Sequence, residues 1–266
     1  MISINGVEIK PTIFPDGTSQ VWKLPEDLLQ TIYKEMVTTI KWDFKSEAEF
    51  MHLCQLKTLL DTYVTLPAVI NLDIPYLPYG RQDKRVENGS TFALHTFTSL
   101  INSLNFNEVH TIDAHNNLRA NMIEGLEDHS PREYIQAALD ATQASIMLFP
   151  DKGAVTRYSS YNLGTGWTYA DKVRDQATGV IKNIAIKGKV KDLKVLIVDD
   201  LCDGGMTFKL VAEQAIKDGA KEVHLYVTHG IFSRGLETLR ESGIQRVFTY
   251  KGEQPRVTIP LYDGGH

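Results

Sequence analysis

Two neighbouring carboxylates, Asp199 and Asp200, precede a turn that contains Gly204, Gly205 and Thr207. Glycines allow backbone N–H groups to approach an anion closely, and a helix N-terminus adds a positive partial charge, so this turn suits a phosphate group. The carboxylates would repel phosphate and instead suit vicinal hydroxyls or a divalent metal. A phosphate beside a diol describes ribose 5-phosphate or a related compound. The alternative is an ordinary turn between a buried strand and a capped helix.

The elements that must position these groups can be predicted from the flanking residues. Four apolar residues at 195–198 predict a buried parallel strand that ends at the carboxylates. An amphipathic run at 208–218 predicts a helix, with Thr207 as its N-cap and Gly219 as its stop. A strand, a turn and a helix are therefore expected in direct succession.

Other predicted strands also end in polar groups, where ligands bind in α/β sheets. The groups that follow or end strands are Arg81, Gln82, Asp83, Lys84 and Arg85, then Asp113 and His115, and then Asp151. Lys172 and Arg174 alternate along a predicted strand and would point the same way. The alternative for each set is a charged loop or hairpin that faces solvent.

Composition limits the classes of function. The chain has 266 residues, 42 % of them hydrophobic and 23 % charged, which is typical of a globular protein. The net charge of −5 does not favour nucleic-acid binding. Two distant cysteines, Cys54 and Cys202, predict neither a zinc site nor a disulfide framework. No signal peptide and no membrane-spanning run is evident, so a cytoplasmic protein is expected.

Strands that alternate with helices along the chain predict an α/β fold with mostly parallel sheets. Acidic residues and glycines recur at strand ends in both halves, as though one unit had been duplicated. The break at 127–131 places the expected domain boundary after residue 128, which gives domains 1–128 and 129–266. Final strands are expected at 247–250 and 257–261.

Several stretches together resemble the ribose-phosphate diphosphokinases, also called phosphoribosyl-diphosphate (PRPP) synthetases. In chain order the matching stretches are Pro75–Lys84, Asp113–His115, Pro150–Arg157, Asp171–Arg174, Asp199–Thr207 and Thr228–Ser233. The resemblance implies two phosphoribosyltransferase-type, Rossmann-like domains, the first for ATP and the second for ribose 5-phosphate and PRPP. It implies transfer of the β,γ-diphosphoryl group of ATP to the C1 hydroxyl of ribose 5-phosphate, with Mg²⁺.

The same resemblance implies roles for individual residues. The ATP-binding residues would be Phe14, Asp16, Arg81, Gln82, Asp83 and His115. The ribose-5-phosphate-binding residues would be Asp199, Asp200, Asp203, Gly204, Gly205, Met206 and Thr207. His115 and Asp151 would hold the metal, while Lys172, Arg174 and Arg81 would act on the transferred group. Phe14 and Asp16 would meet the adenine of a neighbouring subunit's ATP, which implies a homodimer or a larger homo-oligomer.

The chain departs from the family pattern at a few places. Thr18 stands where Glu is usual, Gly204 and Met206 alter the phosphate loop, and Arg234 follows Ser233 where Gly is usual. The C-terminal segment is short, so a less regulated enzyme is expected. A PRPP-dependent phosphoribosyltransferase and a non-catalytic regulatory partner of a synthetase are the alternatives. Nucleic-acid and membrane roles have no support in the sequence.

Overall fold

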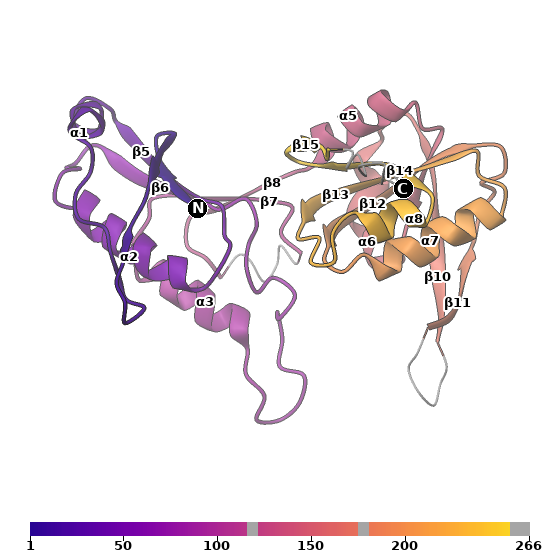
Figure 1. Ribbon diagram of the computed structural model, residues 1–266, viewed down its shortest axis with the longest axis horizontal. Helices are drawn as coiled ribbons and strands as arrows, with labels where there is room; N and C mark the ends of the chain where they lie inside the picture. The colour runs from indigo at the N-terminus through magenta and orange to yellow at the C-terminus, as the bar shows by residue number, and fades with distance from the viewer. Residues whose placement is uncertain (116–121, 175–180, 256–266) are drawn as a thin grey trace, which may run out of the picture. The chain divides into compact units, whose positions relative to one another are not determined.

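The computed structural model describes residues 1–115, 122–174 and 181–255, without the side chains of 172–174 and 181–183. The chain divides into two compact units, Met1–Ser130 and Pro131–His266. This division falls two residues after the boundary that we expected. Each unit contains its own largely parallel sheet with helices packed against it (Figure 1).

The first unit is built on a six-stranded sheet with the order β2-β1-β5-β6-β7-β8. Its strands are β1 (Ile2–Ile4), β2 (Val7–Ile9), β5 (Val37–Trp42), β6 (Val69–Asp73), β7 (Val109–Ile112) and β8 (Leu126–His129). Its helices are α1 (Glu26–Ile32), α2 (Ala48–Leu60) and α3 (Ala93–Asn102). Strands β5 to β8 run parallel, whereas β1 pairs antiparallel with β2 and β5. Strands β1 and β2 form a hairpin, which turns at Asn5 and Gly6 where φ is positive.

The second unit has a seven-stranded sheet with the order β11-β10-β9-β12-β13-β14-β15. Its strands are β9 (Ile146–Phe149), β10 (Gly166–Arg174), β11 (Ile181–Ile186), β12 (Lys194–Cys202), β13 (Glu222–Gly230), β14 (Ile244–Thr249) and β15 (Gly252–Glu253). Its helices are α5 (Arg132–Thr142), α6 (Lys152–Tyr158), the 3-10 turn η1 (Ser159–Tyr161), α7 (Met206–Lys217) and α8 (Glu237–Glu241). Strands β10, β9, β12, β13 and β14 run parallel. The strand expected at 257–261 lies outside the described residues.

The apolar run at 195–198 forms part of β12, the central strand of this sheet. Val195 and Ile197 point into one hydrophobic cluster, with residues of α7 and α8. Leu196 and Val198 point into the other cluster, with residues of α5 and α6. A parallel strand that is covered on both faces needs apolar residues at every position, which accounts for the unbroken run. The predicted α/β fold with mostly parallel sheets is thus confirmed.

The helices of the described residues include none that is long and apolar enough to cross a membrane.

Candidate active site

The predicted phosphate turn lies between the end of β12 and the start of α7. The helix begins at Met206, with Gly205 at the N-cap position in the left-handed conformation at φ +77°. The first intrahelical bond joins the Lys209 N–H to the Gly205 carbonyl oxygen. The N–H groups of residues 206–208 come before this bond and have no carbonyl partner within the helix, so they can donate to an anion. This helix N-terminus is therefore consistent with the predicted phosphate turn, whose role stays a prediction.

The expected cap at Thr207 is wrong, and tertiary packing explains why. A β-carbon at position 205 would lie 2.9 Å from Leu239 Cδ2, and Leu239 is buried. The close approach of α8 and the positive φ together require glycine at 205. With Gly205 as the N-cap, the helix begins at Met206, one residue before Thr207. Thr207 therefore occupies the first turn of α7, and Met206 beside it is 48 % exposed.

Replacing Gly205 by alanine is expected to destabilise the protein by about 1–3 kcal/mol, the usual cost of a left-handed non-glycine residue, with a further loss from the clash with Leu239. Urea-induced unfolding would measure this loss. Gly164→Ala is a matched control, because Gly164 also has a positive φ, of +72°, but has no heavy atom within 4 Å of the added carbon. Equal losses in the two variants would show that packing against α8 is unimportant.

Three carboxylates and one guanidinium lie near the carboxyl ends of β9 and β12. The Asp200 N–H donates to Asp199 Oδ1 at 3.0 Å, and Asp200 is buried. Asp151 caps α6 by accepting hydrogen bonds from the N–H groups of Gly153 and Ala154. Arg157, in the last turn of α6, lies with its Nη1 3.9 Å from Asp200 Oδ2. Arg157 was within a recognised motif but had no predicted role.

Asp199 has the most perturbed ionisation of this group. Burial raises the pKa of its carboxyl well above the ordinary value, and the negative charges of Asp200 and Asp151 raise it further. Neighbouring carboxylates that are shielded from water repel one another, so the ionised form of Asp199 is unfavourable in the folded protein. Hydroxyl groups that donate hydrogen bonds, or a cation, would relieve this charge.

In the first unit four of the predicted ATP residues, Arg81, Gln82, Asp83 and His115, follow β6 and β7. Arg81 and Gln82 are exposed, and Asp83 is half-buried. A β-carbon at Gly80 would lie 3.6 Å from the β-carbon of His115, so the loop after β6 and the residue after β7 are neighbours. The structure thus brings His115 close to the start of the Arg81–Asp83 stretch at one edge of the sheet.

Phe14 and Asp16 lie on the hairpin formed by β3 (Thr12–Ile13) and β4 (Ser19–Gln20). The ring of Phe14 packs edge-on against Trp22, which is 64 % exposed. Thr18 donates to Asp16 Oδ1 from both its hydroxyl, at 2.7 Å, and its backbone N–H, at 3.0 Å. These bonds lower the pKa of the Asp16 carboxyl, the hydroxyl having the larger effect. The residue that replaces the family's Glu therefore orients Asp16.

Lys172 and Arg174 lie on β10, where their backbones pair with Ile184 and Ile181 of β11. The two strands form a hairpin that projects from the second unit (Figure 1). The predicted strand is present, but both side chains lie outside the described part of the chain, so their roles stay predictions.

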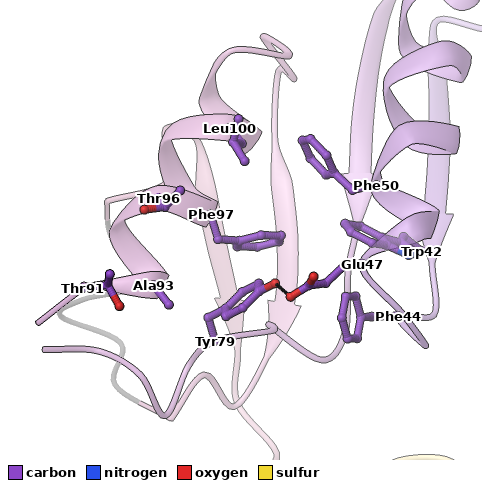
Figure 2. A pocket seen from close by; sticks show the side chains of 10 residues that line it. All are labelled: Trp42, Phe44, Glu47, Phe50, Tyr79, Thr91, Ala93, Thr96, Phe97 and Leu100. Atoms are coloured by element: carbon purple, nitrogen blue, oxygen red, sulfur yellow. Dashed lines mark hydrogen bonds between the residues drawn. The ribbon is translucent and has the colours of Figure 1, made fainter.

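An aromatic pocket of about 360 Å³ lies in the first unit. Figure 2 shows Phe97 and Leu100 of α3 on one wall and Trp42, Phe44 and Phe50 on the other. The Tyr79 hydroxyl donates to Glu47 across the pocket, and this bond is the main reason that the pKa of Tyr79 is raised to about 12. Sequence patterns did not indicate this pocket, because its walls come from segments about 50 residues apart.

Comparisons with known proteins agree with the motifs. Residues 159–254 match the model of the phosphoribosyl transferase domain. The ribose-phosphate pyrophosphokinase of Sulfolobus acidocaldarius is 28 % identical over 91 % of this chain and 84 % of its own length. That of Pyrococcus furiosus is 29 % identical over 87 % of this chain and 80 % of its own length. The chain is therefore similar to ribose-phosphate pyrophosphokinases over most of its length.

Solved structures support the fold of a ribose-phosphate pyrophosphokinase. The phosphoribosylpyrophosphate synthetase of Mycobacterium smegmatis superposes with a TM-score of 0.72 over 90 % of this chain and 78 % of its own, at 18 % identity. The resemblance that the motifs indicated is confirmed, and with it the fold of two phosphoribosyltransferase-type domains. The roles of individual residues remain predictions.

Proposed function

We propose that this chain is a ribose-phosphate pyrophosphokinase that transfers the β,γ-diphosphoryl group of ATP to the C1 hydroxyl of ribose 5-phosphate. The similarity to curated pyrophosphokinases over most of the chain carries this proposal. A phosphoribosyltransferase would need only the second unit, whereas the similarity extends through both. PRPP and AMP would be the products, and such substrates imply a cytoplasmic location.

In this proposal the second unit binds the sugar phosphate. The N–H groups at the start of α7 hold the 5-phosphate, and the carboxylates of Asp199 and Asp200 accept hydrogen bonds from the ribose hydroxyls. Arg157 beside Asp200 fixes the carboxylate that it contacts. The residues of β12 that precede the two carboxylates, Val195 to Val198, are buried, so water would not reach the sugar from that side. The C1 hydroxyl is thereby held in position for attack on the β-phosphorus of ATP.

The first unit would bind ATP through Phe14, Asp16, Arg81, Gln82, Asp83 and His115. The C1 oxygen would form a bond to the β-phosphorus as the bond from that phosphorus to the bridging α,β-oxygen breaks. AMP leaves, and the proton of the C1 hydroxyl is released to solvent. Lys172 and Arg174 would stabilise charge on the diphosphoryl group during transfer. Because the hairpin of Phe14 and Asp16 would serve a neighbouring subunit, the proposal includes a homodimer or a larger homo-oligomer.

Mg²⁺ is the proposed cofactor, with His115 and Asp151 as its protein ligands. No group of three or more potential metal ligands is assembled among the described residues. Mg²⁺ commonly binds one or two protein groups together with substrate phosphates and water, so a sparse set of ligands fits it. The charge of Asp151 is also one of the causes that raise the pKa of Asp199, which supports a cation near these carboxylates. The bound ion would neutralise phosphate charge on ATP.

The test is AMP release from ATP and Mg²⁺, with and without ribose 5-phosphate, with PRPP trapped by a coupled transferase. AMP that forms only when the sugar phosphate is present is the expected result. Omission of Mg²⁺ should abolish it. Binding of PRPP without any AMP release would instead favour a transferase or a silent partner.

A further inference from the structure

Arg234 lies against the phosphate turn although it is 30 residues away in sequence. A β-carbon at Gly204 would lie 3.4 Å from the Nε atom of Arg234 and 3.5 Å from its Cδ. The contact therefore involves the guanidinium end of the side chain and not only its stem. Arg234 is itself exposed, so the group is accessible to a ligand in the turn.

The backbone fixes this position. The N–H groups of Ile231 and Phe232 both donate to the Cys202 carbonyl oxygen, at 2.8 and 3.2 Å, which ties the loop after β13 to the last residue of β12. Phe232 has a positive φ of 49°, and the Gly235 N–H donates to the Phe232 carbonyl oxygen at 2.8 Å. This tight reversal, anchored one residue before Asp203, holds Arg234 beside Gly204.

The charge at the turn explains why a cation is useful there. The segment Asp199–Thr207 contains three carboxylates and no Lys or Arg. A sugar phosphate adds further negative charge to this segment, and the partial charge of the α7 N-terminus offsets only part of it. Within the part of the chain that the structure describes, the Arg234 guanidinium forms no ion pair with a carboxylate.

We propose that Arg234 binds the 5-phosphate of the sugar substrate and sets the affinity for it, an inference that rests on the proposed function. A guanidinium presents a planar set of N–H donors that matches phosphate oxygens, and it keeps its charge at every working pH. Arg234 thus supplies the side-chain cation that the glycine turn lacks. It is a binding residue, and ATP affinity should not depend on it.

Calorimetric titration of the full chain with ribose 5-phosphate, and separately with ATP, tests this inference. Arg234→Gln should weaken ribose 5-phosphate binding by about 10- to 100-fold, the range for losing a charged hydrogen bond, and leave ATP binding unchanged. In turnover assays the KM for ribose 5-phosphate should rise while kcat stays nearly constant. Arg234→Lys should keep part of the affinity. Lys217→Ala makes the same change of net charge at the exposed far end of α7 and should alter neither affinity.

Two results would overturn the inference: an unchanged affinity for ribose 5-phosphate in Arg234→Gln, or an equal loss for both ligands, which would indicate a structural role. The proposed function can fail separately. If the wild-type protein released no AMP but Arg234→Gln selectively lost ribose 5-phosphate affinity, Arg234 would still be the phosphate residue, in a protein with another activity.

Discussion

Replacing Lys172 by alanine is expected to lower turnover by roughly 100-fold or more, the scale of losing one donor that stabilises charge in a transition state. The backbone of Lys172 lies on β10, opposite Ile184 of β11. If its ammonium group acts on the diphosphoryl group during transfer, kcat should fall while the affinities for ATP and ribose 5-phosphate change little. Single-turnover AMP release together with equilibrium titration of each substrate would separate these quantities.

Lys189→Ala is the matched control for this variant. Lys189 is exposed in the same unit and carries the same charge, but no motif includes it. Near wild-type turnover in Lys172→Ala would contradict the role assigned to the hairpin of β10 and β11. A parallel loss in Lys189→Ala would point to general electrostatics and not to a specific donor.

The second large effect is expected from Asp199→Asn, which should lower activity by at least about tenfold and yet raise thermal stability at neutral pH. The activity falls because a charged acceptor for the ribose hydroxyls is lost. The stability rises because burial and neighbouring carboxylates raise the pKa of Asp199 in the folded state well above its ordinary value of 3.8. An uncharged amide avoids the cost of that buried charge, a trade of stability against function that is common at active sites.

The sign of the pH dependence follows from the raised pKa. Between pH 3.8 and the folded pKa of Asp199, the folded chain holds more protons than the unfolded chain, so the contribution of Asp199 to stability falls as pH rises through that interval. Melting temperatures measured across this interval should show that fall in the wild type and a flatter profile in Asp199→Asn. Asp192→Asn, at an exposed position with positive φ that Asn tolerates, should keep the wild-type profile. Identical profiles for Asp199→Asn and the wild type would show that this charge is not costly.

Local sequence patterns predicted the elements around the site well because their causes are local. The apolar run at 195–198 is needed wherever a parallel strand is covered on both faces, and β12 contains it. The amphipathic pattern at 208–218 likewise corresponds to α7, which ends at Lys217. Segments whose apolar residues repeat with the period of a helix, or run unbroken as in a buried strand, can therefore be predicted as helix or strand from the sequence.

The details that decide function could not be predicted in this way. The start of α7 depends on Leu239 packing against Gly205, a contact across 34 residues. The position of Arg234 depends on hydrogen bonds from the loop after β13 to Cys202. The raised pKa of Asp199 depends on burial and on Asp151 from another strand end. Each of these is a tertiary effect that no local pattern contains.

The buried thiol of Cys202 gives the phosphate turn a chemical property of its own. Burial, together with the negative charges of Asp203 and Asp199, raises the pKa of this thiol to about 12. Since the thiolate is the form that reacts, the raised pKa makes this thiol poorly reactive at neutral pH. Hydrogen peroxide and alkylating agents attack thiolates, so the residue that anchors the turn should resist both.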